Sequence, residues 1–320
     1  MTMKIDAEEL ISLLYRESTR ITPDQYRGWA LEQLSRVIDF DAAFWGSGNR
    51  ADLHFHYVNH IGLDDNYAMR LKETLSINPI KEAVIGNLGR PVNMTDVYKD
   101  DAFYSSELYH ELFQPYGIER ILAAGHFDHD NGLYSLISLY RFDREQVFTE
   151  AERSLQQRLV FHLVSAVSHA FFLHLRAGHF LQQTKDQATS AICDFNGCFH
   201  EVQPRFVSLL NQYFPERSDS NLPFEIPEEK STIEINNLSV SFKPLGDLVI
   251  VSLRLLGPLD ALSKREQQIV TLICKGLSFK EAARQINVAP STVSNHIYRV
   301  YEKLGINSRT ELAQLVDEQN

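Results

Sequence analysis

Helix-like and strand-like patterns of apolar residues alternate along the first two-thirds of this 320-residue chain. Apolar residues at three-to-four spacing predict helices over residues 6–38 and 64–88, the second one interrupted at Asn78-Pro79. Alternating or short apolar runs that end at glycine, proline or asparagine predict strands over 40–46, 53–58, 118–127, 133–142, 191–194, 198–202, 232–243 and 247–256. Two of the turns, Asn131-Gly132 and Asn196-Gly197, are typical of β-hairpins.

One predicted helix is longer than the others and is apolar on two sides. It begins at a capping box formed by Thr149 and Glu152 and extends to about Leu181. A helix that is apolar on two faces must be buried on both faces. We expect one face to cover the sheet of its own domain and the other to meet a second subunit.

The last 60 residues carry three further capping boxes, each at the start of an apolar, helix-periodic run. In such a box the serine oxygen accepts a backbone N–H of the first turn, and the glutamate accepts the N–H of the cap residue. The three boxes are Ser263/Glu266, Ser278/Glu281 and Ser308/Glu311. They predict a compact helical domain with helices over 264–275, 279–286, 290–304 and 309–316.

The second and third of these helices form the pattern of a DNA-binding helix-turn-helix. A short helix precedes Asn287, which suits a left-handed turn, and Pro290 suits the first position of the longer helix. The motifs Leu-Ser-Lys-Arg-Glu from 262, Gly-Leu-Ser-Phe-Lys-Glu-Ala-Ala from 276, Ala-Pro-Ser-Thr-Val-Ser-Asn-His-Ile from 289 and Glu-Lys-Leu-Gly-Ile-Asn-Ser-Arg from 302 follow in order. The segment resembles the LuxR-type DNA-binding domain over nearly its whole length.

This resemblance implies a set of DNA-contacting residues on and around the 290–304 helix. The base-facing positions would be Ser294, Asn295 and Tyr298. The candidate phosphate contacts are Lys280, Thr292, His296, Arg299, Lys303 and Arg309. An asparagine can read the edge of adenine, and lysine or arginine neutralises phosphate.

Two residues depart from the family pattern. Family members often carry lysine where this chain has Ser294 and a serine cap where it has Ala289. The first change removes a cation from the groove face. The second leaves the recognition helix without a side-chain cap, which is worth about 1 kcal/mol.

The order of elements before residue 257 resembles two sensory modules. Residues 6–178 resemble a GAF-type sensor, and residues 186–256 resemble a small PAS-like module. We therefore expect α+β domains followed by an all-α four-helix domain, with limits at 1–181, 186–256 and 258–320. By the same resemblance, a ligand would lie between the first sheet and the overlying helices, against the aromatic residues Phe44, Trp45, Tyr57, Phe103, Tyr104 and Tyr109.

Charge is unevenly distributed along the chain. The net charge is −11, but residues 262–316 hold eight lysines and arginines against four acids, which gives +4 there and −15 elsewhere. An acidic body disfavours non-specific binding to phosphate, and a mildly basic domain still permits docking. The chain has three cysteines and no apolar leader, and we expect none of its apolar runs to be long enough to span a bilayer. These features predict a cytoplasmic protein without a membrane segment.

Other classes of protein fit the sequence less well. It contains no Gly-x4-Gly-Lys-Ser/Thr loop for nucleotide hydrolysis, no catalytic constellation, and no layout of a phosphorylated receiver domain. A sigma-factor domain has similar helices but would not explain the fourth helix. Acyl-homoserine-lactone receptors share the terminal domain, but their shorter sensor does not align here. The histidine groups at 54–60, 126–129 and 162–179, and Cys193 with Cys198, leave metal binding open, although we expect neither metal nor cofactor.

The sequence thus favours a transcriptional regulator over an enzyme. We expect it to bind double-stranded DNA at a two-fold operator as a homodimer, under control of a small-molecule effector sensed by the acidic body. If it activates, it would also contact RNA polymerase. The alternative is a regulator whose body is a protein–protein interaction module. The sequence leaves open the effector, the operator, the target genes and the choice between activation and repression.

Overall fold

The computed structural model describes residues 3–49, 55–128, 133–181, 188–217, 221–228 and 230–319. These residues fall into two compact units. The first comprises Met1–Leu181, Ser190–Lys230 and Phe242–Val251, and the second comprises Gln182–Thr189, Ser231–Ser241 and Ser252–Asn320. The two units share the residues of a second β-sheet, so the three domain limits predicted from the sequence remain a proposal.

A five-stranded antiparallel sheet organises the first unit. Its strand order is β2-β1-β5-β4-β3. The strands are β1 (Ala42–Asn49), β2 (Phe55–Ile61), β3 (Val92–Asn93), β4 (Arg120–Phe127) and β5 (Leu133–Arg141). In the centre of the sheet Ile137 pairs with Trp45 on one side and with Ala124 on the other. The turn predicted at Asn131-Gly132 lies outside the described residues.

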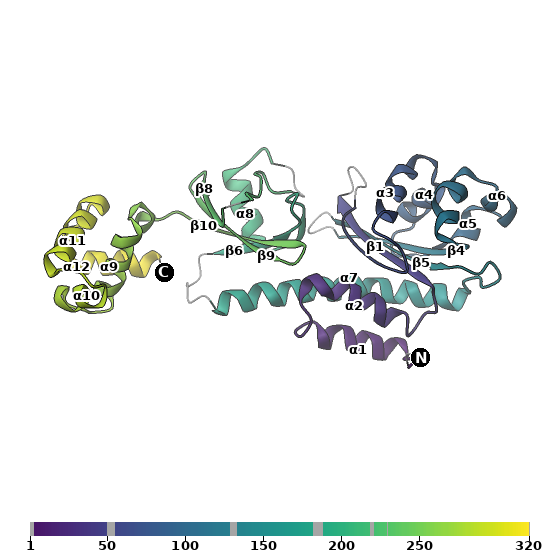
Figure 1. Cartoon of the computed structure of the whole chain (residues 1–320), viewed down its shortest axis with the longest axis horizontal. Coiled ribbons are helices and arrows are strands. Elements are labelled where there is room, and N and C mark those ends of the chain that lie inside the picture. The colour runs from purple at the N-terminus through teal and green to yellow at the C-terminus, as the bar shows by residue number, and fades with distance from the viewer. Residues whose placement is uncertain are drawn as a thin grey trace. The chain divides into compact units, whose positions relative to one another are not determined.

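Three helices cover one face of this sheet: α1 (Ala7–Glu17), α2 (Pro23–Leu34) and α7 (Glu150–Leu181). They lie on the same side of β1, β4 and β5 in Figure 1. The single helix predicted over 6–38 is in fact two helices. The chain turns at Ser18–Ile21, and Pro23 restarts the helix at its first position, where the missing N–H costs nothing.

Shorter helical segments cover the opposite face. They are α3 (Tyr67–Glu73), η1 (Leu75–Ile77), α4 (Pro79–Gly86), α5 (Met94–Val97), α6 (Asp100–Tyr104), η2 (Tyr109–Phe113) and η3 (Gln114–Tyr116). The interruption predicted at Asn78-Pro79 is confirmed. The Asn78 side chain accepts the backbone N–H groups of Ile80 and Lys81 and so caps α4.

The long helix α7 is a core helix. Its predicted capping box is present: the Thr149 N–H donates to the Glu152 carboxylate at 2.8 Å, and the Glu152 N–H donates to the Thr149 hydroxyl at 3.3 Å. By length and hydropathy alone, Glu150–Leu175 could cross a bilayer, but 44% of its most apolar stretch is buried inside the protein. The core helix of a folded domain passes the same test, and Leu159, Leu163 and Phe171 are completely buried here.

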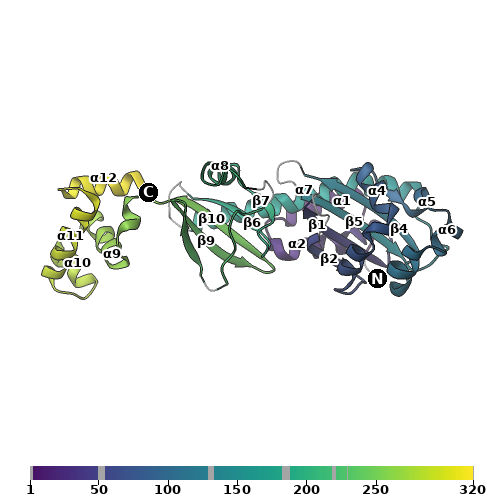
Figure 2. The same cartoon turned by 90° about the horizontal axis from the view of Figure 1, so that it is seen from above.

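A second antiparallel sheet follows, with the strand order β7-β6-β10-β9-β8. Its elements are β6 (Thr189–Cys193), β7 (Phe199–Val202), α8 (Pro204–Tyr213), β8 (Thr232–Ile235), β9 (Leu238–Leu245) and β10 (Leu248–Leu255). Figure 2 shows β6, β10 and β9 side by side. The single strand predicted over 232–243 is a hairpin. Asn236 and Asn237 both have positive φ angles, 47° and 63°, which is the geometry of a tight hairpin turn.

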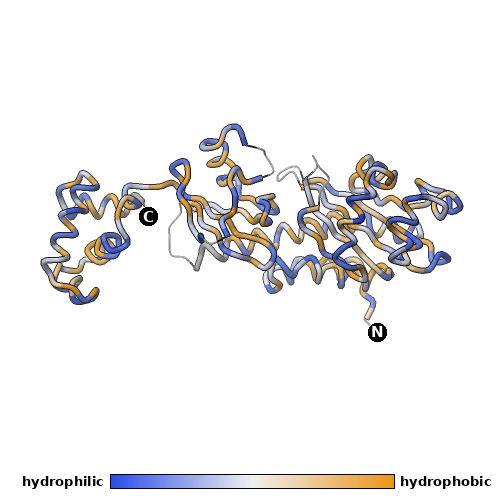
Figure 3. The backbone as a smooth tube through the Cα atoms, turned by 45° about the horizontal axis from the view of Figure 1, so that its top comes forward, coloured by the Kyte–Doolittle hydropathy of each residue, from blue (hydrophilic) through white to orange (hydrophobic). Residues whose placement is uncertain are grey.

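The chain ends in a helical domain of η4 (Pro258–Ala261), α9 (Lys264–Cys274), α10 (Phe279–Gln285), α11 (Pro290–Leu304) and α12 (Arg309–Gln319). Hydrophobic and hydrophilic stretches alternate turn by turn along these helices (Figure 3). Their inner faces form one core around Ile269, Ile273, Val293, Ile297 and Val300. The chain contains two antiparallel sheets with their associated helices, followed by an all-α domain. This arrangement confirms the fold class predicted from the sequence.

Candidate DNA-binding surface and sensory cavity

The helix-turn-helix is formed by α10, the turn at Asn287 and α11. Ala282 and Ala283 are completely buried, so the short α10 can approach α11 closely. Asn287 has a φ angle of 56°, as expected for a left-handed turn residue. The helix α11 starts at Pro290 without a side-chain cap on Ala289 and ends at Gly305, whose φ angle is 68°.

The outward face of α11 presents the predicted base-reading side chains. Ser294, Asn295 and Tyr298 are exposed, and 65% of the Tyr298 surface is open to solvent. Val293, Ile297 and Val300 are buried on the opposite face. An exposed stripe of polar and aromatic groups on a helix that is anchored from behind is the geometry needed to enter a DNA groove.

The predicted phosphate contacts are in different environments. Lys280 and Arg299 are exposed, whereas Thr292 and His296 are only partly exposed. The Nδ1 atom of His296 is buried and has no hydrogen-bond partner among the described residues. One guanidinium nitrogen of the exposed Arg309 donates to the carbonyl oxygen of Ile273, so this side chain also ties α12 to α9.

Lys303 has a structural partner that sequence reasoning missed. Its ammonium nitrogen lies 2.7 Å from the Glu266 carboxylate, and the Glu266 side chain is 5% exposed. The hydrogen bond from Lys303, helped by N–H and O–H donors of Ser263, lowers the pKa of Glu266 to about 2. The same carboxylate accepts the N–H of Ser263 in the capping box of α9. Glu266 therefore connects the start of α9 to the end of α11.

Two of the three terminal capping boxes have the predicted geometry, at Ser263/Glu266 and Ser278/Glu281. The third differs. The Ser308 hydroxyl accepts the N–H of Glu311 at 3.1 Å, but the Glu311 carboxylate accepts the N–H of Asn307 and the hydroxyl of Ser308. Glu311 thus accepts the N–H of Asn307, the residue before the cap, rather than the N–H of the cap residue Ser308.

A mostly apolar cavity lies on the face of the first sheet that α3 and α4 cover. The volume inside it that the centres of water molecules can occupy is about 50 Å³. Its polar groups include three tyrosines and Ser138, and the Tyr67 hydroxyl donates to that of Tyr140 at 2.8 Å. The lining residues are Phe55, Tyr67, Leu71, Leu75, Asn78, Ile80, Lys81, Val84, Ile85, Phe113, Ile121, Ala123, Tyr134, Leu136, Ser138 and Tyr140.

None of the six predicted ligand residues lines this cavity. Trp45 and Tyr57 belong to the core beneath α1, α2 and α7, on the other face of the sheet. The remaining four, Phe44, Phe103, Tyr104 and Tyr109, pack in the core on the cavity's side without lining the cavity. Period-two alternation along β5 was the signal that could have found the lining, since residues 134, 136, 138 and 140 all face it.

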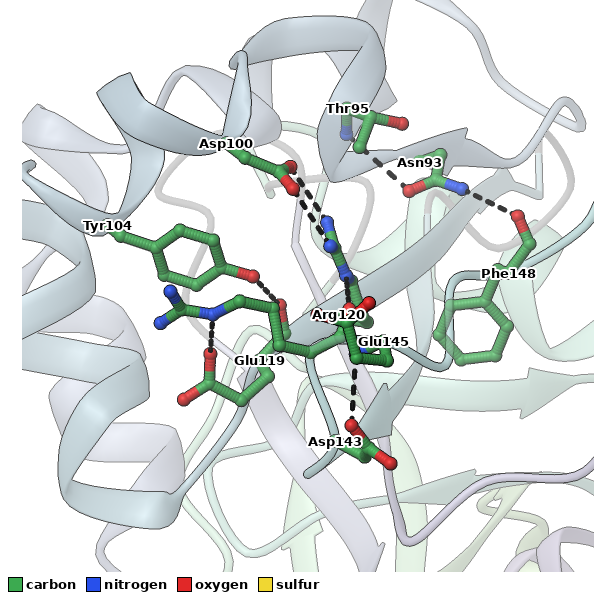
Figure 4. A network of polar contacts seen from close by, with 10 residues as sticks. Asn93, Thr95, Asp100, Tyr104, Glu119, Arg120, Asp143, Glu145 and Phe148 are labelled. Atoms are coloured by element: carbon green, nitrogen blue, oxygen red, sulfur yellow. Dashed lines mark hydrogen bonds and ion pairs between the residues drawn. The ribbon is translucent and has the colours of Figure 1, made fainter.

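Tyr104 belongs to a polar network at the N-terminal end of β4 (Figure 4), and Tyr109 joins the same network. The Tyr104 hydroxyl donates to the carbonyl of Glu119 at 3.0 Å, and the Tyr109 hydroxyl donates to the Glu119 carboxylate at 2.7 Å. Arg120 forms a two-pronged pair with Asp100 at 2.8 and 2.9 Å. These contacts fasten α6 and η2 to β4, so the two tyrosine hydroxyls already serve the fold.

The candidate metal residues that the structure describes do not come together. Within the described part of the chain, no three His, Cys, Asp or Glu side chains lie close enough to hold an ion. His54, His129 and the side chain of His179 fall outside that part. Cys193 and Cys198 are buried, and burial raises the pKa of the Cys193 thiol well above its ordinary value, which keeps it protonated.

The geometry of α10, the Asn287 turn and α11 defines a DNA-binding helix-turn-helix. A family model described as bacterial regulatory proteins, luxR family, matches residues 260–316. The terminal domain therefore belongs to the LuxR family, as its motifs predicted.

Curated relatives match the same segment. The response regulator UvrY of Escherichia coli K12 is 41% identical over 59 residues, which cover 18% of this chain and 27% of UvrY. The transcriptional regulatory protein UhpA of the same organism is 38% identical over 58 residues, 18% of this chain and 30% of UhpA. The chain thus matches less than a third of the length of either relative.

Among solved structures, Escherichia coli SdiA aligns with 98% of this chain and 97% of its own, at 12% identity and a TM-score of 0.40. A phycocyanobilin-bound GAF domain from a cyanobacterial phytochrome aligns with 57% of this chain and 100% of its own, at 11% identity and a TM-score of 0.37.

Proposed function

We propose that this chain is a transcriptional regulator that binds double-stranded DNA through α11. The observation that carries the proposal is the exposed row of Ser294, Asn295 and Tyr298 on a helix of a LuxR-family domain. Asn295 would read a base edge, with Tyr298 and Ser294 beside it in the groove. The proposed phosphate contacts are Lys280, Thr292, His296, Arg299, Lys303 and Arg309. Lys303 and Arg309 would bind phosphate while keeping their contacts to α9.

A mobility-shift assay on the promoter next to the protein's own gene tests this function. Asn295→Ala should weaken sequence-selective binding about tenfold or more, because a good base contact is worth roughly 1–3 kcal/mol. Thr271→Ala is the matched control, since Thr271 is exposed on α9, which is not part of the helix-turn-helix. Equal binding by both variants would contradict the assigned role of α11, and no selective shift under any effector would contradict the function.

Binding would require a homodimer, because one recognition helix reads too few base pairs for a specific site. We propose that the second copy docks on the outward face of α1 and α7. Phe161 and Phe172 on α7 are 57% and 40% exposed, and Tyr15 on α1 is 36% exposed. His162 lies beside Tyr15, with 3.4 Å between its Nδ1 atom and the tyrosine oxygen.

The dimer surface can be tested with two phenylalanines of similar exposure. Phe161→Asp should weaken self-association at least tenfold in analytical ultracentrifugation, because it places a charge in an apolar contact. Phe142→Asp is the control, since Phe142 is 43% exposed but lies at the end of β5. If Phe161→Asp leaves the dimer affinity unchanged, the dimer interface does not lie on this face of α1 and α7.

The first domain would control DNA binding by holding a small effector in the cavity beneath α3 and α4. A compact, mostly apolar ligand that hydrogen bonds to Tyr67, Tyr134 or Ser138 fits the lining. Native mass spectrometry of the purified protein tests for a retained molecule. If no small molecule is retained and a protein partner co-purifies instead, the body is an interaction module rather than a sensor of metabolites. If the regulator activates, RNA polymerase is a further partner.

A further inference from the structure

One charged side chain lines the cavity beneath α3 and α4. Among the described lining residues Lys81, on α4, is the only one that carries a charge, and no carboxylate lines the cavity with it. Lys81 is partly exposed, so its ammonium group keeps contact with solvent while its side chain borders the cavity. The charge of the lining is therefore positive.

Lys81 has no acidic partner within the protein. It makes no ion pair among the described residues. The residues three and four positions further along α4, Val84 and Ile85, are apolar, and the residue three positions before it is the cap Asn78. Helical neighbours at these spacings are the ones that usually supply an opposite charge. The ammonium group is thus left to pair with something other than this helix.

The hydroxyl groups of the lining are neutral hydrogen-bond donors. Burial raises the pKa of Tyr67 and of Tyr134 above the ordinary value of a phenol, and it raises the pKa of Tyr140 to about 12. All three tyrosines are therefore protonated at neutral pH and add no negative charge that would repel an anion. The Tyr67 hydroxyl is already used, because it donates to that of Tyr140 at 2.8 Å.

The Tyr134 hydroxyl lies beneath the same helix as Lys81. A Cβ atom added to Gly125 would lie 2.6 Å from this hydroxyl and 2.9 Å from a methyl group of Val84, so the hydroxyl is close to Val84. Val84 is one turn along α4 from Lys81. This hydroxyl makes no hydrogen bond within the described part of the chain. The α4 side of the cavity thus offers a cation and an unused O–H donor.

The size of the cavity limits what it can hold. The volume open to the centres of water molecules, about 50 Å³, corresponds to roughly three to five waters. Most of the lining is apolar, for example Leu71, Ile121 and Leu136. Such a space suits one compact apolar group and excludes a long chain. A phosphate carries close to two negative charges, whereas a carboxylate carries one, which a single lysine can balance.

We propose that the effector is a compact monocarboxylic acid, whose apolar body fills the cavity and whose carboxylate pairs with Lys81 on the α4 side. This assignment rests on the proposed sensory function of the first domain and names the class of its ligand. The carboxylate accepts the ammonium N–H of Lys81, and an acceptor on the ligand takes the hydroxyl of Tyr134. Neutral and cationic molecules of the same shape lack the pairing with Lys81.

Calorimetric titration of the full-length protein with benzoate, benzamide and benzylamine tests the assignment. These probes have similar shapes and carry a negative, zero and positive charge. We expect benzoate to bind about tenfold more tightly than either of the others, because a hydrogen bond to a charged group is worth at least that factor. Lys81→Met should remove the preference, and Lys81→Arg should keep it. Tyr134→Phe should weaken benzoate binding about threefold through the lost donor.

Lys72→Met is the matched control, because Lys72 is exposed on the neighbouring helix α3 and does not line the cavity. This variant should bind all three probes like the parent, and circular dichroism checks that each variant folds. If Tyr134→Phe does not fold, the Lys81 variants decide.

Equal affinity for benzoate and benzamide, no binding of benzoate at millimolar concentrations, or benzoate binding that Lys81→Met leaves unchanged would overturn the assignment. Benzoate binding that depends on Lys81 but not on Tyr134 would place the acid outside the cavity and overturn it as well. A neutral molecule retained by the purified protein in native mass spectrometry would refute the acid and leave the sensor standing. Co-purification of a protein partner with no small molecule would instead contradict the sensor itself.

Discussion

At the scale of single residues, Glu266 and Lys303 determine how the recognition helix is held. The carboxylate caps α9 and pairs with an ammonium group near the end of α11. The sequence predicted the cap, because a capping box is a local pattern. It could not predict the pair, because the two residues are 37 positions apart and meet only after the helices pack.

Replacing Glu266 with glutamine should lower the stability of the terminal domain at neutral pH. The pKa of Glu266 is about 2 in the folded protein, below that of an unfolded glutamate, so the ion pair stabilises fully above about pH 4.5 and less as pH falls toward 2. Because Lys303 is 43% exposed, solvent screening limits the loss to about 1 kcal/mol.

Hydrogen exchange of the α9 and α11 amides in the intact protein measures this loss. Glu302→Gln is the matched control, since Glu302 is exposed on α11 and makes no ion pair among the described residues. We expect the gap between Glu266→Gln and the wild type to shrink between pH 7 and pH 4. A gap of the same size at both pH values would show that charge is not the cause.

The uncapped start of the recognition helix gives a second residue-scale prediction. Ala289 makes no side-chain cap, and its backbone already has the extended conformation of a cap residue. Ala289→Ser should therefore raise the stability of the domain by about 0.5–1 kcal/mol. Thermal unfolding of the full-length protein measures the change. An unchanged or lower melting temperature would refute the assignment of Ala289 as the cap.

At the scale of elements, local signals decide which predictions are accurate. The terminal helices were placed well because serines, glycines and Pro290 mark their ends. The β8–β9 hairpin was missed because its turn consists of two asparagines within an otherwise continuous strand pattern. Phe44 and Trp45, both predicted to line one pocket, lie in the cores on opposite faces of the sheet, because neighbours on a strand point to opposite faces.

Replacing each of two glycines in the first domain with alanine should change the stability of the protein in opposite directions. A Cβ atom on Gly125 of β4 would lie 2.6 Å from the Tyr134 hydroxyl and 2.9 Å from a Val84 methyl, whereas nothing lies within 4 Å of one on Gly28 of α2. Gly125→Ala should cost about 1–2 kcal/mol by overpacking beside the cavity. Gly28→Ala should add about 0.5–1 kcal/mol through helix propensity. Thermal unfolding distinguishes them, and equal melting temperatures would contradict the packing at Tyr134.

At the scale of the whole molecule, charge is divided between an acidic body and a basic terminal domain. Residues 262–316 carry +4 and the remainder −15, so the body repels DNA and leaves contact to the terminal domain. Ser294 supplies no charge at the groove face of α11. We therefore propose that selective binding depends on two copies acting together, with dimerisation through the body as the controlling step.

Selection of DNA from a random-sequence pool by the full-length protein tests this account most directly. The account predicts enrichment of a two-fold symmetric site whose half-sites are centred about 10 base pairs apart, one helical turn. Asn295→Ala should lose the enrichment at the base it reads, while Thr271→Ala keeps it. Enrichment of no sequence, or of a single asymmetric half-site by both variants alike, would contradict a dimeric regulator that reads DNA through α11.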